Sequence, residues 1–502
     1  MMRDSFGLAA LGLAVFHLIL GFLVFEPTLF PGGDNAGYLI LGDALRSGEG
    51  YRDLHLPGTP LHARYPPFLP LLLAGLGWIG GVGLAKIAML LFTATTVWAT
   101  AHFGRVWVGA GPGIAAAALL AANPTLLEYG HYILSEGPLV LLIVTVLWLS
   151  AKEDGRSAAF AMAASVGAFA TRTAGMAILL ALPLAWLLSG RYRRAAWAAC
   201  VAFGTLAAWA LYQGWAAADQ PGYLAVLLLI DPYTPGEGTV SLQGLIERGA
   251  ANSWAYVSSV LPAMLFGPAS DVGGGRILVG IVVSLAALVG WAQAARERLG
   301  APEIYTILYA GLIALWPSVW TDQRFLLPLF PVLLLLAVAS VWRVPLPSFS
   351  RWLRWAGPAL IAILGFAWVV EVTPGRLTCA ASHRVGRPCD PPASSSLYAA
   401  AQWARDNTPP EAVIANRKPR LFFLYSRRRG DVYPFSADPA TVMEGLEAMG
   451  ASYVVVDQVS GTTGRYLIPA IRAFPSRFEV VYERGEPVTV ILRLLPATAE
   501  IE

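Results

Sequence analysis

The chain has 502 residues, of which 56% are hydrophobic and only 13% are charged, and its mean hydropathy is +0.58. Since a soluble domain carries about a quarter charged residues, this composition excludes an ordinary soluble protein and predicts a polytopic membrane protein. The formal net charge of +3 is small for this length, and no Lys/Arg block stands on a polar segment, which argues against nucleic acid as a partner.

The first apolar run, 6–25, is long for a signal-peptide core and precedes no small-residue cleavage site, so we predict a retained transmembrane helix. The chain then alternates between apolar runs and short polar intervals. The predicted spans are 6–25, 84–103, 113–122, 137–150, 157–170, 175–188, 195–215, 276–295, 303–320, 325–342 and 352–370. This makes about 11 transmembrane helices, the shorter of which would be buried among the others.

The distribution of Lys and Arg predicts the orientation, because basic loops stay in the cytoplasm. With the N-terminus inside, the basic loops, such as the one with Arg191, Arg193 and Arg194, fall on the inner side. This holds only if 66–80 and 254–266 do not cross but lie as re-entrant or interfacial helices on the outer face. Three polar regions are then extracytoplasmic, namely 26–83, 217–275 and the chain beyond 371.

The composition changes to soluble patterns near residue 393. We predict a transmembrane domain at 1–371 with a first outer loop at 26–83, a Pro/Ser/Gly-rich linker at 372–393 and a small α/β domain at 394–502. Within that domain "SLYAAAQWARDN" and "ADPATVMEGLEAMG" are typical of helices, and "EAVIAN", "RLFFLYS" and "SYVVVD" of strands. Cys379 and Cys389 match no metal or redox motif and could form a disulfide in an oxidising compartment.

Two polar motifs follow the first span. "GGDNAGYLILGDALRSGEG" carries Asp34, which could cap the following amphipathic helix, act as a catalytic carboxylate, or do both. "HLPGTPLHARYPPFLPLLLAGLGW" carries Arg64 and Tyr65, which could anchor an interfacial helix in the headgroup region, line a substrate cavity, or do both.

Three further charged residues interrupt apolar helices. Glu136, in "ILSEGP", either favours the dipole of its helix or has a function, because ionisable groups are costly at membrane depth. Arg172 lies in "ATRTAG", and Arg324 lies in "DQRFLLPLFP", where the alternative is a local ion pair with Asp322. Arginine offers phosphate a fork of permanently charged donors. We therefore predict that the two acids and two arginines converge in one cavity and act on a phosphorylated lipid.

These segments, taken in order, resemble the polytopic glycosyltransferases of the GT-C superfamily, near the bacterial protein-mannosyltransferase-like and aminoarabinose-transferase-like branch. The matching features are "GGDNAGYLILGDALRSGEGYRD", "YPPFLPLLLAGLGW", "NP" followed by "ILSEGP", "ATRTAG", "RFLLPLFP", and a C-terminal domain with "PRLFFLYSRR" and "SYVVVD". The resemblance covers nearly the whole chain. It departs at Asn35, where many relatives have a second acid, at Glu136, where some use Asp, and at Arg172, where some use Lys.

The resemblance implies a transferase of the bacterial inner membrane whose C-terminal domain is periplasmic and whose donor is a polyprenyl-phosphate-linked sugar. Asp34 would be the general base for an acceptor hydroxyl that attacks the anomeric carbon with inversion, and Glu136 would be a second catalytic acid. Arg172 and Arg324 would bind the donor phosphate. The acceptor would be a lipid, a glycan or a protein. No metal-binding motif is present, and the participation of a divalent cation is left open.

Two other classes of function fit a polytopic chain. A transporter or flippase of lipid-linked glycans would need broken helices or ionisable residues at mid-membrane, and usually two related halves. Here the charged residues gather at one face instead, which favours the transferase. A non-catalytic membrane assembly protein would use the spans as an anchor and the C-terminal domain for a partner, and it would be indifferent to Asp34.

Overall fold

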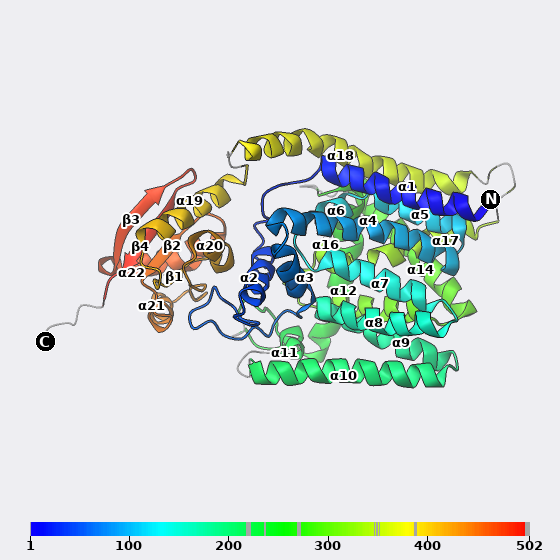
Figure 1. Cartoon of the computed structure of the whole chain (residues 1–502), viewed down its shortest axis with the longest axis horizontal. Helices are drawn as coiled ribbons and strands as arrows, with labels where there is room; N and C mark the ends of the chain where they lie inside the picture. Colours follow the sequence, from blue (N-terminus) through cyan, green and yellow to red (C-terminus); the bar gives the residue numbers. More distant parts are fainter. Residues whose placement is uncertain are drawn as a thin grey trace. The chain divides into compact units, whose positions relative to one another are not determined.

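The computed structural model describes residues 2–216, 222–234, 237–268, 273–345, 347, 350, 352–385 and 389–496. The chain divides into two compact units, whose elements are labelled in Figure 1. The membrane unit comprises Met1–Glu26, Ala63–Leu69 and Val82–Thr378, and the C-terminal unit comprises Pro27–His62, Pro70–Gly81 and Cys379–Glu502. Most of the first outer loop predicted at 26–83 therefore groups with the C-terminal residues.

Every span predicted from the sequence coincides with a helix. These helices are α1 (Met2–Leu23), α4 (Gly81–Trp107), α5 (Ala110–Ala121), α7 (Glu136–Ser150), α8 (Gly155–Thr171), α9 (Met176–Leu188), α10 (Tyr192–Ala216), α14 (Gly274–Glu297), α15 (Ala301–Leu315), α17 (Phe330–Trp342) and α18 (Leu353–Arg384). Among the described residues, five helices, α1, α4, α10, α14 and α18, are long and apolar enough to cross a membrane. The predicted polytopic helical membrane fold is confirmed.

Short helices connect these elements within the membrane unit. They are α6 (Pro124–Tyr129), α11 (Tyr223–Leu228), α12 (Leu242–Ala255), α13 (Leu261–Phe266) and α16 (Gln323–Leu326). A π-helical segment at Tyr256–Val260 joins α12 to α13, so the helical run is longer than the interfacial helix predicted at 254–266. The first half of this run is polar, and composition alone favours a loop there.

Several helix ends differ from the predicted ends, most clearly those of α15 and α18. Helix α15 stops at Leu315 instead of residue 320, because Trp316 precedes Pro317 and takes an extended conformation, as residues before proline usually do. Helix α18 continues to Arg384, so the first part of the segment 372–393, predicted as a linker, is helical. Pro358 and Pro374 lie inside this helix.

Small residues let the helices of the membrane unit approach closely. Helices α7 and α8 run side by side, and α14 lies against α17 (Figure 1). At Gly290 in α14 an added Cβ would overlap the carbonyl oxygen of Leu336 in α17. Such small-residue contacts are the usual way that membrane helices pack, since lipid gives no hydrophobic driving force between them.

The C-terminal unit contains a four-stranded sheet with helices on both faces. Its strands are β1 (Ile414–Ala415), β2 (Tyr453–Val456), β3 (Phe478–Arg484) and β4 (Thr489–Leu494), in the order β1-β2-β4-β3 with only the β1–β2 pair parallel. Helices α19 (Pro392–Asn407) and α20 (Pro419–Ser426) share one apolar cluster with the sheet, and α21 (Pro439–Ala448) and α22 (Ile468–Ala473) share the other. The small α/β domain is confirmed.

The prediction that "RLFFLYS" is a strand is wrong, because this segment forms helix α20. A short apolar run carries no period that separates strand from helix. Pro419 stands at the first position of the helix, where its fixed φ and missing N–H are favourable. The helix buries Leu421, Phe422 and Phe423 and ends at Arg427 in the left-handed conformation.

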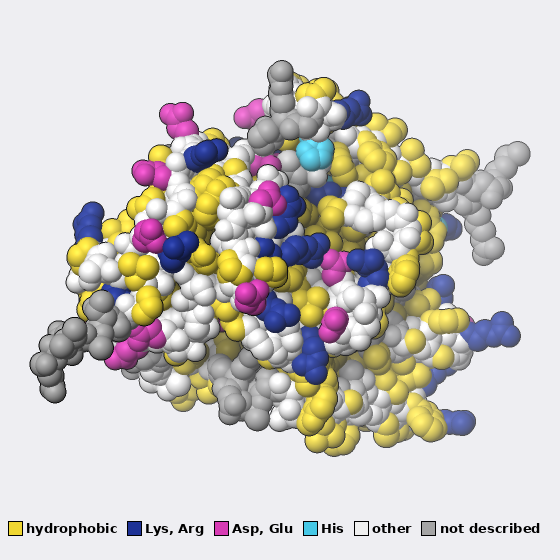
Figure 2. All heavy atoms as spheres, turned by 60° about the vertical axis from the view of Figure 1, so that its left-hand side comes forward, with side chains coloured by type: hydrophobic (Ala, Val, Ile, Leu, Met, Phe, Trp, Pro, Cys, Tyr) yellow, Lys and Arg dark blue, Asp and Glu magenta, His cyan; other side chains and the backbone are white. Residues whose placement is uncertain are grey.

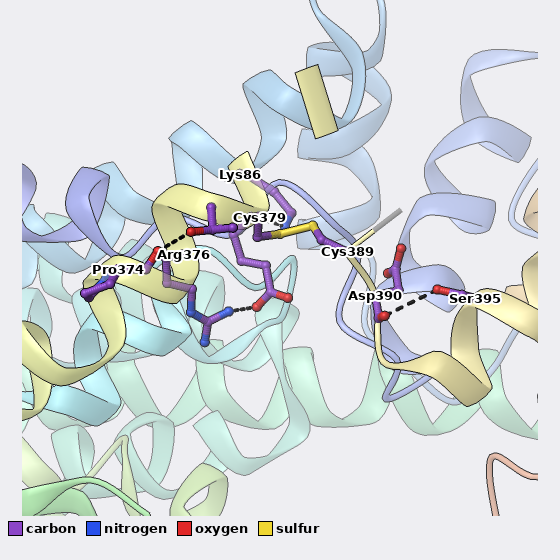
Figure 3. Close-up of a disulfide and its surroundings, with 9 residues drawn as sticks. Lys86, Pro374, Arg376, Cys379, Cys389, Asp390 and Ser395 are labelled. Atoms are coloured by element: carbon purple, nitrogen blue, oxygen red, sulfur yellow. Dashed lines mark hydrogen bonds and ion pairs between the residues drawn. A yellow bond between two sulfur atoms is a disulfide. The ribbon is translucent and has the colours of Figure 1, made fainter. Parts of the chain in front are cut away.

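The C-terminal unit also contains a disulfide and the two helices that follow the first span. Cys379 and Cys389 are bonded, and the hydroxyl of Ser395 donates to the carbonyl of Asp390 just beyond the bridge (Figure 3). Helices α2 (Asp34–Arg46) and α3 (Phe68–Gly77) pack closely where Gly42 meets Leu73. On the face that Figure 2 brings forward, acidic and basic side chains are interspersed.

We expect Gly290→Ala to destabilise the membrane unit by about 1–3 kcal/mol, because the methyl group meets backbone that cannot move aside as a side chain would. The matched control is Gly204→Ala in α10, where an added Cβ has no neighbour within 4 Å. Thermal unfolding of the two variants in detergent measures the difference. Equal melting temperatures for the two would show that α14 and α17 do not pack at this point.

Candidate active site

The carboxylate of Glu136 is the centre of a charged cluster in the membrane unit. Its side chain is fully buried at the start of α7. The guanidinium groups of Arg172 and Arg324 both donate to the same oxygen, Oε1 of Glu136. The hydroxyl of Ser135 donates to the other oxygen, Oε2, at 3.4 Å. Burying a carboxylate is costly unless it is paired, and here two cations pair with it.

Each arginine comes from a break between helices. Arg172 ends α8 in an extended conformation, and a single 3-10 turn, Thr173–Gly175, separates it from α9. Arg324 lies in the short helix α16, whose N-cap is Asp322. The Asp322 carboxylate accepts a hydrogen bond from the Arg324 backbone N–H at 2.8 Å, whereas the Arg324 guanidinium donates to Glu136. Asp322, the local partner considered for Arg324, therefore bonds only to its backbone N–H. The Arg324 guanidinium pairs instead with Glu136, which is distant in the sequence.

Aromatic side chains line this cluster, and the sequence motifs did not predict them. The Arg172 guanidinium lies 5.0 Å from the ring centroid of Phe325, and the hydroxyl of Tyr309 donates to the Phe325 carbonyl at 3.0 Å. Tyr129 interacts electrostatically with Glu136. Burial raises the pKa of Asp322, and the charge of Arg324 opposes this effect. Within the cluster, two guanidinium groups face the one carboxylate of Glu136, so the positive charges outnumber the negative one.

We expect Glu136→Gln to destabilise the protein by about 3 kcal/mol, because it leaves two partly buried arginines without the charge that they share. The matched control is Glu153→Gln. Glu153 pairs with Arg191, but its side chain is 85% exposed, so its loss should cost at most about 0.5 kcal/mol. Equilibrium unfolding in mixed micelles gives both values, and equal costs would contradict the buried cluster.

Asp34 lies in the C-terminal unit, in the first turn of α2. The N-cap of this helix is Gly33, with φ 85°, so Asp34 is not the cap that the sequence allowed for. Its carboxylate oxygen Oδ1 lies 3.6 Å from Nη1 of Arg420, a residue of α20. The Asp34 side chain is one-quarter exposed, in contrast to the fully buried Glu136.

A second set of ionisable groups surrounds Arg420. Asp53 accepts a hydrogen bond from the ring of His62 at 2.8 Å, and His55 lies 3.8 Å from its other oxygen. Burial raises the pKa of Asp53, but the hydrogen bond and charge of His62, with His55 and Arg420, outweigh it and lower the pKa. Burial, helped by the charge of Arg420, lowers the pKa of His55 to about 4, so this ring is neutral at physiological pH.

Because the unfolded chain takes up a proton at His55 near pH 6.5 and the folded chain only near pH 4, stability should fall as the pH falls through this window. The loss attributable to His55 is up to about 3 kcal/mol. We expect His55→Gln to flatten the decline of the melting temperature between pH 7 and 4, and the exposed His383→Gln to leave it as in wild type. An unchanged slope in the His55 variant would contradict its burial as a neutral ring.

The structure brings together three of the predicted residues, Glu136, Arg172 and Arg324, in the membrane unit, and it places Asp34 in the other unit. Arg64 and Tyr65 belong to the membrane unit, where Tyr223 donates a hydrogen bond to the Arg64 carbonyl. Their predicted place in a substrate cavity stays a prediction. Sequence reasoning missed Arg420, although "KPR" directly before an apolar run could have drawn attention to it.

The donor set for a metal ion is poor. The part of the chain that the structure describes contains no group of three or more His, Cys, Asp or Glu side chains that could hold a metal ion. The guanidinium of Arg420 lies beside Asp34, and Lys418 also interacts electrostatically with Asp34. These residues offer a metal ion few ligands.

Comparisons with known proteins give structural matches only. No protein-family profile matches the chain, and no curated protein sequence does. The crystal structure of ArnT from Cupriavidus metallidurans bound to undecaprenyl phosphate aligns with 14% identity over 98% of this chain and 98% of that chain, with a TM-score of 0.59. The oligosaccharyltransferase AglB from Archaeoglobus fulgidus, in complex with an inhibitory peptide and a dolichol phosphate, aligns with 15% identity over 91% of this chain and 70% of that chain, with a TM-score of 0.57.

These similarities extend over both units of the chain. They agree with the resemblance predicted from the order of the sequence motifs. The chain therefore has the fold of the GT-C glycosyltransferases.

Proposed function

We propose that the protein is a membrane glycosyltransferase that moves a sugar from a polyprenyl-phosphate donor to an acceptor hydroxyl. The observation that carries this proposal is the fold, which the chain shares from end to end with a transferase crystallised with undecaprenyl phosphate. The paired arginines of the membrane unit support it independently, since a phosphate needs fixed, permanently charged donors.

In the proposed reaction the acceptor oxygen attacks the anomeric carbon while Asp34 takes the hydroxyl proton. The bond between that carbon and the phosphate oxygen breaks, and the polyprenyl phosphate leaves with the electron pair. Arg172 and Arg324 stabilise the negative charge that develops on the leaving phosphate. Attack from the face opposite the phosphate inverts the anomeric configuration.

The burial of Glu136 favours a positioning role for this residue. Both arginines donate to one of its oxygens, so it fixes the direction in which each guanidinium presents its remaining N–H groups. Each guanidinium is a planar fork of permanently charged N–H donors, a geometry that suits phosphate as well as carboxylate.

The disulfide supports an extracytoplasmic position for the C-terminal domain. Cys379 and Cys389 are bonded, and disulfides persist in oxidising compartments such as the periplasm. We therefore propose that the protein lies in the bacterial inner membrane with the N-terminus in the cytoplasm and transfers sugar on the periplasmic side. The acceptor, whether lipid, glycan or protein, and the participation of a divalent ion stay open predictions.

Label transfer from a radiolabelled polyprenyl-phosphate hexose to candidate acceptors tests the function. We expect purified wild-type protein to transfer label and Asp34→Asn to lose about 100-fold or more in rate, because the amide cannot accept the proton. The matched control is Asp43→Asn, since Asp43 lies in the same helix and pairs with Arg46 at its surface. An Asp34→Asn protein as active as this control would remove the proposed base and favour a non-catalytic assembly protein.

A further inference from the structure

Arg420 reaches the proposed base from the C-terminal domain. It is the second residue of α20, and its Nη1 lies 3.6 Å from Oδ1 of Asp34 at the start of α2. Both side chains are about three-quarters buried, so solvent screens the pair less than it would at an open surface. The contact joins residues 386 positions apart in the chain, because 420 − 34 = 386.

Helix α2 is shaped to receive this side chain. Asp34 and Gly37 lie three positions apart, hence on the same face of the helix. A Cβ added at Gly37 would lie 3.3 Å from both Cδ and Nη1 of Arg420, which is tighter than ordinary contact. The guanidinium therefore rests against bare backbone. Beside it, Ala36 packs with Tyr398 and Leu421, which fixes α2 against α19 and α20.

Other ionisable groups interact electrostatically with Arg420. Its charge acts on Asp53 and His55 in the loop before residue 62, and on Asp431 after α20. The backbone N–H of Gly430 donates to the His55 carbonyl at 2.8 Å, which ties that loop to the chain next to Asp431. Arg420 thus lies among acids from three segments, and only one of these acids, Asp34, is the proposed base.

We propose that Arg420 is the positioning residue of Asp34: it holds the carboxylate in one orientation while the acceptor hydroxyl approaches. A guanidinium beside one carboxylate oxygen limits how the carboxylate can turn, and a general base must lie within hydrogen-bond reach of the proton that it takes. The C-terminal unit would then contain both the base and the group that directs it. This inference rests on the proposed function of Asp34.

The alternative is that Arg420 only ties two segments together. If Arg420 only stabilises the contact between these segments, its substitution would lower stability, and the fraction of protein that stays folded would keep the wild-type transfer rate. A positioning residue would lower kcat at constant KM for the donor, because the interaction matters when the proton moves and not when the donor binds.

The main experiment compares Arg420→Gln, Arg420→Lys and Arg420→Ala in the label-transfer assay on full-length protein. We expect Arg420→Gln to lower kcat about 100-fold, the loss typical of a misplaced catalytic group, with KM for the donor unchanged. Arg420→Lys should recover part of the loss, and added guanidinium ion should raise the rate of Arg420→Ala. The matched control is Arg427→Gln, since Arg427 ends the same helix and pairs with Asp43 at 3.8 Å, but its side chain is 57% exposed. Arg420→Gln with the kcat of this control would overturn the proposal.

A second measurement does not depend on activity. The melting temperatures of wild type, Asp34→Asn, Arg420→Gln and the double variant form a double-mutant cycle. If the two groups interact, the loss of melting temperature in the double variant differs from the sum of the two single losses. Additive losses overturn the contact and with it the inference. A wild-type protein that transfers no label overturns the proposed function and the positioning role together, whereas active wild type with an inactive Asp34→Asn and a fully active Arg420→Gln overturns the positioning role alone.

Gly37→Ala gives a further check with Arg420 in place. The new methyl group should push the guanidinium away from its seat on α2 and lower kcat in the same direction as Arg420→Gln, but less. Gly37→Ala combined with Arg420→Gln should be no worse than Arg420→Gln alone. A larger loss in the combined variant would show that Gly37 serves another purpose and would contradict the proposed seat.

Discussion

The membrane unit depends on one buried carboxylate. Glu136 opens α7, Arg172 closes α8, and Arg324 lies in the short helix before α17, so their ion pairs fix three breaks in the helical structure at one place. None of the three could lie in this apolar surrounding alone, because each charge needs a partner when water is removed. The cost of breaking the cluster therefore keeps the loops between these helices in one arrangement.

The C-terminal unit contains a similar charged cluster, but with one cation among several carboxylates. There one guanidinium, Arg420, lies among the carboxylates of Asp34, Asp53 and Asp431. The position of Arg420 also depends on Gly37, because a side chain at residue 37 would occupy the surface of α2 against which the arginine lies. In both units, charged residues from distant segments stabilise loops and helix ends that hydrophobic packing alone would leave variable.

The sequence allowed the helices to be predicted well, because a span needs a long apolar run and few charges, which are local properties. It failed where the decision is not local. The seven residues of "RLFFLYS" fit a strand or a helix equally, and the choice of helix depends on Pro419 and on burial against the sheet. The partner of Arg324 was uncertain for the same reason. Asp322 is two residues away and Glu136 is 188 residues away, and only the fold decides that the guanidinium turns to Glu136.

The two acids singled out by the motifs have opposite surroundings. Glu136 is fully buried, and one of its oxygens already accepts from two arginines, so an acceptor hydroxyl could reach it only if the cluster opened. Asp34 has Nη1 of Arg420 at 3.6 Å from its Oδ1, and its side chain is one-quarter exposed. In the proposed reaction this contrast favours Asp34 as the base and Glu136 as the residue that holds the guanidinium groups of Arg172 and Arg324 in place.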